Sequence, residues 1–273
     1  LETLMGKYGE EGNQLIFKIL KRGEKLDVSQ GEKGLSDLAL RYDLTVPLAR
    51  VVANYKNELP KFFKRYQIQP VWRADRPARG RYREFYQCDV DAIGSKSMIV
   101  EAELCAAVSE ILQKLGFEDF VIKLNHRQLL TQIVREAEIP QERMTDALVA
   151  LDKLDKIGND GVLKELIERG IKADQAELFV AMFEGFEGLE QATRELNKTG
   201  FDTFNKAFLN RWEEGLNDDD NVNKEVTKEL RQLIEFSKNN SSAKHIRIDP
   251  TLARGLSYYT GAIFEINVPV LSF

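Results

Sequence analysis

The pattern of apolar and polar positions changes character twice along this chain of 273 residues. Residues 1–125 mix short apolar stretches of strand type with amphipathic helical stretches. From about residue 126 to 243 only helical periods occur, and strand patterns return at residues 246–248 and 261–268. The sequence therefore predicts an α+β core, residues 1–125 and 244–273, that is interrupted by an all-helical insertion domain at residues 126–243.

Within the first part, apolar runs and alternation predict strands over residues 15–20, 38–45, 66–74, 81–93 and 120–124. Residues 21–34 are polar and rich in glycine, which predicts a loop, and residues 75–80 contain the Pro and Gly of a turn. Pro47 suits the first turn of a helix that would bury Leu48, Val51, Val52 and Tyr55, and Ser97 suits the cap of the next helix.

Composition narrows the class of protein. Apolar residues make up 43% and charged residues 30% of the chain, as in globular proteins, and no apolar run approaches the length of a membrane span. Cys88 and Cys105 are too few for a disulfide framework or a zinc site, so we expect a reducing, cytoplasmic setting. His126 and His245 cannot form a metal centre by themselves, and we expect them in loops or at the surface. The first residues lack both an initiator Met and a signal-peptide pattern, so we expect an internal start.

Charge is unevenly distributed. The net charge of −5 argues against a non-specific nucleic-acid binder with one basic face. Residues 213–220 are acidic, whereas residues 61–83 contain one acidic residue, Asp75, and eight basic ones: Lys61, Lys64, Arg65, Arg73, Arg76, Arg79, Arg81 and Arg83. We therefore expect an anionic ligand near residues 61–83.

The strand predicted at residues 81–93 carries the most informative pattern. Alternation places six polar or aromatic side chains on one face: Arg81, Arg83, Phe85, Gln87, Asp89 and Asp91. A generic charged strand face of this kind is more often simply solvated. Here, however, the basic residues gather at one end and the acidic residues at the other, with an aromatic ring between them. This order suits a ligand with phosphates at one end and an ammonium group at the other.

Two further segments have polar patterns, and two common motifs are absent. Arg41, Asp43 and Thr45 share a face of the strand predicted at residues 38–45. Residues 253–261 place paired tyrosines beside an arginine, between two glycines, although such pairs more often pack in a core.

A P-loop and a nucleophile elbow are both missing, so neither a P-loop nucleotide site nor covalent catalysis is expected.

Three segments together resemble the histidyl-tRNA synthetases. Residues 40–47 (LRYDLTVP) resemble the amino-acid-binding loop of that family, and residues 72–87 (WRADRPARGRYREFYQ) resemble class II synthetase motif 2. Residues 254–261 (RGLSYYTG) resemble the histidine-specific signature. The resemblance implies a class II synthetase-type antiparallel sheet flanked by helices, and it extends over most of the chain.

The resemblance also implies roles for individual residues. Asp43, Leu44, Thr45 and Gln87 would bind histidine around its α-amino group, and Asp91, Tyr258 and Tyr259 would form the imidazole pocket. ATP would be bound by Arg73, Asp75, Arg81, Tyr82 and Phe85, with Phe85 stacking on adenine. Arg73 and Arg254 would be the catalytic residues, at the α-phosphate and the histidine carboxylate.

Activity and partners follow as expectations. The implied reaction is ATP-dependent activation of histidine to histidyl-adenylate and its transfer to tRNA(His), by a cytoplasmic homodimer that uses Mg²⁺, whose protein ligands the sequence does not identify. Motif 1, motif 3 and an anticodon-binding domain are not recognisable, so we expect an incomplete catalytic core. For residues 269–273 the sequence leaves open a native continuation, a non-native junction and a segment after a gap. Asp75 and Ser257 replace the more usual Glu and Asp. The alternatives are a catalytically inactive regulatory or tRNA-sensing relative, and a structural interaction domain. The retained Arg73, Arg81 and Arg254 favour an enzyme.

Overall fold

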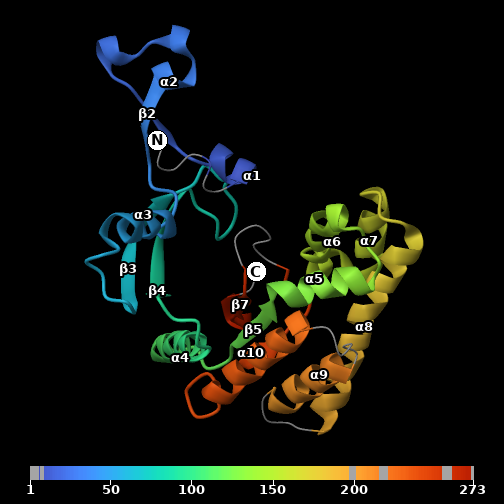
Figure 1. The fold of residues 1–273 in the computed structure, drawn as a ribbon. Helices are drawn as coiled ribbons and strands as arrows, with labels where there is room; N and C mark the ends of the chain where they lie inside the picture. Colours follow the sequence, from blue (N-terminus) through green and yellow to red (C-terminus); the bar gives the residue numbers. More distant parts are fainter. Residues whose placement is uncertain (1–5, 7–8, 197–200, 215–220, 254–259, 272–273) are drawn as a thin grey trace. The chain divides into compact units, whose positions relative to one another are not determined.

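The computed structural model describes residues 6, 9–196, 201–214, 221–253 and 260–271 (Figure 1). The chain divides into two compact units, Leu1–Lys96 and Ser97–Phe273. Each unit is presented separately below.

The first unit contains two antiparallel strand pairs. β1 (Lys18–Leu20) pairs with β2 (Ser36–Ala39), and β3 (Phe63–Trp72) pairs with β4 (Glu84–Ile93). Its other elements are short helices, namely α1 (Gly9–Gln14), the 3-10 turns η1 (Gly23–Lys25) and η2 (Val28–Gln30), α2 (Glu32–Leu35) and α3 (Thr45–Tyr55). The segment predicted as a loop at residues 21–34 thus contains η1, η2 and the start of α2.

The register of the β3–β4 hairpin decides which side chains are neighbours. Arg65 lies opposite Asp91, Gln67 opposite Asp89, and Gln69 opposite Gln87. Odd-numbered side chains are half-buried on one face from Arg65 to Asp91, while Tyr66 and Tyr86 on the other face are exposed. The predicted alternation is confirmed for residues 85–91.

The strand predicted at residues 38–45 is wrong beyond Ala39. β2 ends there, residues 40–44 form no regular element, and α3 begins at Thr45. The Asp43 carboxylate accepts a hydrogen bond from the backbone N–H of Val46 (3.2 Å) and so satisfies one of the free donors at the start of α3. Pro47 lies in the first helical turn, as predicted, but only Leu48 of the predicted apolar face is buried.

The second unit begins with α4 (Ile99–Lys114) and contains a three-stranded sheet. The N-cap of this helix is Met98, which forms no side-chain cap bond, so the prediction that Ser97 caps the helix is wrong by one residue; Ser97 Oγ accepts from the N–H of Ile99 at 3.4 Å. The strand order is β6 (Ile246–Ile248), β5 (Val121–His126) and β7 (Ala262–Asn267), followed by η4 (Pro269–Leu271). β5 is antiparallel to β7 and parallel to β6. Parallel pairing needs a long connection between the two strands, and the segment between β5 and β6 provides it.

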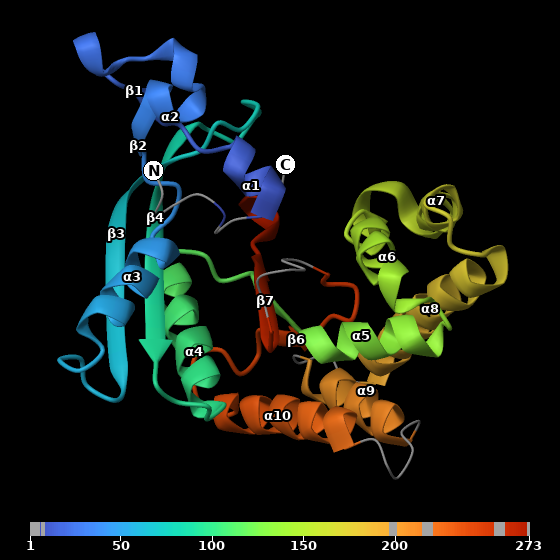
Figure 2. The same ribbon diagram turned by 45° about the horizontal axis from the view of Figure 1, so that its top comes forward.

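All regular secondary-structure elements among the described residues between Arg127 and Ser237 are helices. They are α5 (Arg127–Glu136), η3 (Gln141–Arg143), α6 (Met144–Leu151), α7 (Leu154–Glu168), α8 (Ala173–Leu196), α9 (Asp202–Glu214) and α10 (Asn221–Ser237). α8 contacts α7 and α9, and α10 packs beside α4 (Figure 2). Phe179, Phe183 and Phe208 are fully or almost fully buried here. A positive φ of 65° at Gly158 kinks α7.

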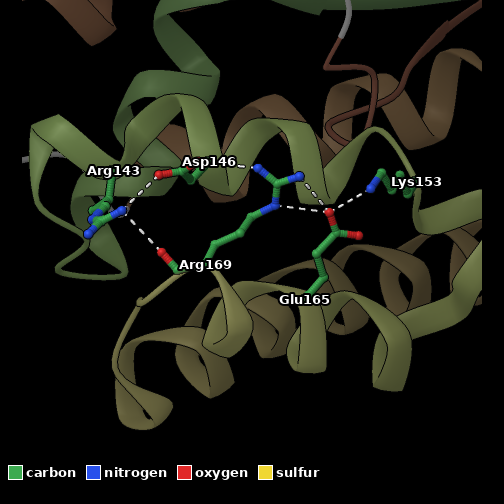
Figure 3. A network of polar contacts seen from close by, with 5 residues as sticks. All are labelled: Arg143, Asp146, Lys153, Glu165 and Arg169. Carbon is green, nitrogen blue, oxygen red and sulfur yellow. Dashed lines mark hydrogen bonds and ion pairs between the residues drawn. The ribbon is translucent and has the colours of Figure 1, made fainter.

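A network of ion pairs connects α6 with α7 (Figure 3). The guanidinium of Arg169 contacts Asp146 (3.2 Å) and Glu165 (2.8 Å), and Lys153 contacts the same Glu165 oxygen (2.6 Å). Arg143 also binds Asp146 and the carbonyl of Arg169. Hydrogen bonds from Lys153 and then Arg169 lower the pKa of Glu165, although burial acts in the opposite direction.

These observations support part of the predicted fold. The chain is α+β, and its described strands form three small sheets with one parallel pair. A continuous antiparallel sheet and the domain boundaries at residues 126 and 243 stay predictions.

Both histidines are buried, so the expectation of surface positions is wrong. His126 is the last residue of β5, whereas His245 lies in the turn before β6, in agreement with a loop position. His126 Nδ1 accepts from the N–H of Gln128 (3.2 Å), and its Nε2 lies 3.2 Å from Glu229. The His245 ring stacks on Phe120 with centroids 3.7 Å apart. Burial lowers the pKa of both imidazoles. They are core histidines whose buried Nε2 atoms form no hydrogen bond among the described residues, and the periodicity of the sequence does not distinguish them from loop residues.

Candidate active site

Three of the predicted histidine-binding residues form the turn that leads into α3. Asp43 is only 7% exposed and Leu44 is fully buried. Thr45 is the first residue of α3 and is half-buried. Because Asp43 also bonds the N–H of Val46, its carboxylate is held in one orientation at this turn.

Three arginines bind this turn to strand β3. Arg41 donates to Gln69 Oε1 (2.5 Å) and to the carbonyl of Pro70 (2.8 Å). Arg65 Nη2 donates to the carbonyl of Leu44 (3.0 Å), and Arg73 Nε donates to that of Tyr42 (3.2 Å). These bonds place the turn beside the odd-numbered face of the hairpin, since Gln69, Arg65 and Arg73 all belong to that face.

A chain of polar contacts extends along the odd face. Arg65 Nε lies 2.8 Å from Asp91 Oδ2, a close ion pair that is not aligned as a hydrogen bond. Arg65 also donates to Gln67, which in turn donates to Gln69 Oε1 (3.0 Å). Asp91 is therefore engaged by Arg65, and an imidazole that binds Asp91 would share the carboxylate with this guanidinium.

Gln87 offers a free acceptor at the centre of this face. Its Oε1 atom is buried and has no hydrogen-bond partner within the described part of the chain. A buried polar atom of this kind is costly unless it is paired, so a donor from a ligand would be stabilised there.

Asp89 was not among the predicted site residues, and the structure adds it. Burial raises the pKa of Asp89, and the carboxylate of Asp91 raises it further; Asp43 acts in the same direction, while Arg65 and Arg73 oppose the shift. Three carboxylates therefore gather around two guanidinium groups, an arrangement that favours a cationic ligand. The missed signal was present in the sequence, because Asp89 has the same parity as Gln87 and Asp91.

Arg73 lies between aromatic rings at the other end of the face. Its guanidinium carbon is 4.5 Å from the centroid of Tyr42 and 5.2 Å from that of Phe85. The backbone N–H of Arg73 donates to the carbonyl of Arg83 (2.9 Å). Because Arg73 lies over the Phe85 ring, an adenine stacked on Phe85 would use the opposite side of the ring or move Arg73.

The other predicted ATP-binding residues lie on the connection between β3 and β4. Asp75 and Arg81 are 3.8 Å apart, and the side chains of Arg81 and Tyr82 are exposed. Gly80 has a φ of 74°, next to a bridge between Ala78 and Arg81. The prediction that Arg81 and Arg83 belong to the strand is wrong, because β4 begins at Glu84.

The second unit contains the segment with the predicted histidine signature. Arg254, Ser257, Tyr258 and Tyr259 lie outside the described residues. On the near side, Asn125 Nδ2 donates to the carbonyls of Pro250 (3.1 Å) and Leu252 (3.0 Å). On the far side, Arg127 N donates to the carbonyl of Gly261 (2.9 Å). Residues 125 and 127, around the end of β5, thus anchor both flanks of the segment.

Comparison with known proteins identifies the family. The sequence profile described as "Histidyl-tRNA synthetase" matches residues 26–272. The chain belongs to the histidyl-tRNA synthetase family. It is 42% identical to the histidine--tRNA ligase of Gloeobacter violaceus over 97% of the chain and 56% of that protein. It is 41% identical to that of Flavobacterium johnsoniae over 98% of the chain and 59% of that protein. The chain thus spans a little over half the length of these relatives.

Solved structures agree in fold. The crystal structure of histidyl-tRNA synthetase from Nostoc sp. PCC 7120 matches 91% of the chain and 56% of that protein, with a TM-score of 0.64 and 28% identity. A structure titled as an ATP phosphoribosyltransferase regulatory subunit/histidyl-tRNA synthetase from Bacillus halodurans C matches 96% of the chain and 59% of that protein, with a TM-score of 0.65. At 21% identity, this second likeness concerns the fold alone.

The described residues contain no cluster of three or more His, Cys, Asp or Glu side chains arranged to hold a metal ion. None of the described helices is both long and apolar enough to cross a membrane.

Proposed function

We propose that this chain contributes the histidine-activating site of an enzyme that forms histidyl-adenylate from histidine and ATP and transfers histidine to tRNA(His). One observation carries the proposal beyond family membership. Asp89 on the odd face of the β3–β4 hairpin interacts electrostatically with the carboxylates of Asp91 and Asp43 and with the guanidinium of Arg73, and Asp43 lies on the turn that leads into α3. A zwitterionic amino acid needs this combination, because its ammonium and carboxylate groups require opposite charges close together.

In this proposal the acidic end of the face binds histidine. Asp43 and the free Oε1 of Gln87 accept from the α-ammonium, beside Leu44 and Thr45. Asp91, with Tyr258 and Tyr259, pairs the imidazole nitrogens. Such a pocket rejects apolar side chains of similar shape, because its own buried polar groups would be left unpaired. Asp89 adds negative charge that strengthens binding of the ammonium group.

The basic end would bind ATP. Phe85 stacks on adenine, and Asp75, Arg81 and Tyr82 position the nucleotide. Attack of the histidine carboxylate on the α-phosphorus brings two anions together, so Arg73 and Arg254 would align them and neutralise the charge that develops. Mg²⁺ would supply further neutralisation of charge, and we assign no protein ligand to it.

The remaining expectations concern the whole protein. The histidine--tRNA ligases that this chain resembles are nearly twice its matched length, so tRNA(His) binding, a homodimer and a cytoplasmic location are proposed for the protein that contains this chain. These three properties are not inferred from the residues of the β3–β4 hairpin.

Histidine-dependent ATP–pyrophosphate exchange by the intact protein tests the proposal. We expect exchange with histidine and none with an apolar amino acid of similar size. Arg73→Ala should lower the exchange rate by about 100- to 1,000-fold, the usual loss when one charge-stabilising donor is removed. Asp89→Asn should raise the KM for histidine and leave the KM for ATP unchanged.

A matched control is Asp119→Asn, which removes an exposed carboxylate outside the first unit and should leave both KM values unchanged. Absence of histidine-dependent exchange, with a known synthetase active in parallel, would exclude the proposed reaction. Equal changes in both KM values for Asp89→Asn would show that this residue does not act on histidine in particular.

The second candidate is a catalytically inactive regulatory or tRNA-sensing relative. The protein from Bacillus halodurans C, whose title names a regulatory subunit, shares the fold, so the fold is compatible with this candidate. Binding of histidine without exchange would support this candidate, and calorimetry on the same protein would detect it.

A further inference from the structure

A pocket in the second unit belongs to none of the predicted site segments. It has a volume of about 250 Å³, and its lining residues come from the end of α5, the middle of α8 and the end of α9. The residues that define it are Glu136, Met182, Gly185, Phe186, Arg211 and Trp212. Ligand sites for drug-sized molecules occupy roughly 300–1,000 Å³, so this pocket suits a single ring system with one substituent.

Gly185 keeps the pocket open. It lies within the helical stretch of α8, and a Cβ atom at this position would meet no other atom within 4 Å. Glycine lowers the stability of a helix, because its backbone loses the most conformational freedom on folding. A larger side chain here would project into open space and would fill the pocket without displacing the protein.

Aromatic rings form one wall. The Trp212 ring is nearly parallel to that of Phe208, with centroids 6.3 Å apart and an interplanar angle of 5°. Phe186 contacts the same Phe208, with centroids 5.0 Å apart. The two rings that line the pocket, Trp212 and Phe186, are thus both supported from behind by one buried residue. A rigid aromatic wall of this kind is a stacking platform for a planar ring.

The polar groups at the pocket carry opposite charges. Arg211 is exposed and makes no ion pair with any described residue, whereas one carboxylate oxygen of Glu136 accepts from Gln132 Nε2 (2.6 Å). The indole N–H of Trp212 is buried and has no acceptor within the described ranges. A complementary ligand therefore has an anionic group for Arg211 and an N–H donor for Glu136 on either side of an aromatic ring.

We propose that this pocket binds one nucleotide. The base stacks on Trp212 and meets the inclined ring of Phe186 at its edge, the phosphate pairs with the guanidinium of Arg211, and a base N–H donates to Glu136. Aromatic carboxylates without an N–H group meet only part of this requirement. The ligand is either a free nucleotide or one nucleotide of an RNA strand. The inference does not depend on the proposed function, which concerns residues of the other unit and the signature segment.

Tryptophan fluorescence gives a direct test, because the chain contains only two tryptophans. In a Trp72→Phe background, Trp212 is the sole indole and reports on the pocket. We expect saturable quenching by adenosine monophosphate. Gly185→Leu should weaken binding by at least about tenfold, since it blocks a stacking site whose loss costs about 1–3 kcal/mol per base. Gly188→Leu is the matched control: it adds the same side chain to the same helix, in open space outside the pocket, and should leave binding unchanged.

The role of Arg211 is tested by comparing adenosine monophosphate with adenosine. The monophosphate should bind more tightly, and Arg211→Gln should abolish the difference. Circular dichroism checks that each variant is folded, and Gly185→Ala, which favours the helix, provides a smaller obstruction if the leucine variant unfolds.

The source of the ligand is decided by a single-stranded RNA tetranucleotide. Binding much tighter than that of the monophosphate assigns the pocket to RNA, and equal binding assigns it to a free nucleotide. The proposal is overturned if neither probe quenches Trp212, or if Gly185→Leu and Gly188→Leu bind the monophosphate equally well.

Discussion

The two compact units are stabilised in different ways. In residues 1–96 the buried apolar side chains are Ile16, Leu44, Leu48 and Val71, and the half-buried face of the hairpin is lined with charges and amides. In residues 97–273 a continuous core joins the β5 sheet to the helices and includes several phenylalanines. The first unit thus relies on ion pairs and hydrogen bonds, and the second on packing.

This difference indicates where each unit tolerates change. Polar networks fix geometry but contribute little net free energy, because each group gives up hydration on folding. Packed cores contribute most of the stability and lose it when atoms are removed. We therefore expect substitutions in the second unit to affect unfolding, and those on the hairpin face to affect binding.

The largest effect is expected from Phe183→Ala. Phe183 is 2% exposed and packs edge-on against Phe179, with centroids 5.0 Å apart. Its truncation should lower the free energy of unfolding by about 3–5 kcal/mol, through lost burial and the cavity left behind. Urea denaturation measures the change, and Phe236→Ala, at a residue that is 45% exposed, should cost much less. Similar costs for both variants would contradict a packed core in the second unit.

A smaller loss is expected from Asn205→Ala. The Asn205 side chain is buried, donates to the carbonyl of Ile246 (2.9 Å) and accepts from the N–H of Ile248 (2.8 Å), which joins α9 to β6. Leaving two buried backbone groups unpaired should cost about 2–4 kcal/mol. The exposed Asn159→Ala, which loses one weak bond to Glu184, serves as the control in the same denaturation series. If Asn205→Ala lowered the free energy of unfolding by less than Asn159→Ala, water would be replacing the hydrogen bonds of the Asn205 amide.

Arg169→Gln should have a modest effect. It removes the centre of the network between α6 and α7, which is partly exposed, so the loss should be about 1 kcal/mol or less and should shrink in high salt. The pKa of Glu165 is lowered in the folded state, so the stability it contributes is present above its ordinary value of 4.5 and is lost as the pH falls through the lowered value. The loss in free energy of unfolding caused by Arg169→Gln should therefore differ between unfolding curves at pH 7 and at pH 3. An equal cost at both would contradict an ionic origin.

The smallest effect on stability, and one of opposite sign, is expected on the hairpin. The pKa of Asp89 is raised above 3.8 in the folded state, so its ionisation destabilises the fold as the pH rises through the raised value. Asp89→Asn should stabilise the protein at pH 7 by roughly 0.5 kcal/mol and have no effect near pH 2. Denaturation at both pH values, with Asp119→Asn as control, measures this. Destabilisation at pH 7 would show that the charge of Asp89 is satisfied within the protein and is not held for a ligand.

Much of the organisation was predictable from periodicity. Alternation in residues 85–91 correctly placed Phe85, Gln87 and Asp91 on one face, and helical periods correctly indicated a helical stretch after β5. The family followed from three short motifs and is confirmed by the comparison. These features are local, since the period of a strand or helix depends only on its own backbone geometry.

The tertiary structure decided which charges meet. Periodicity gives the face of a side chain but not its neighbour across the hairpin, because that depends on the register between two strands. The register places Arg65 opposite Asp91, and the packing of the 40–44 turn brings Asp43 to Asp89 and Tyr42 to Arg73. Burial of His126 and His245 likewise depends on segments far away in the sequence. The sequence determines which residues the chain carries. The fold determines which of them form ion pairs, hydrogen bonds or ring contacts with one another.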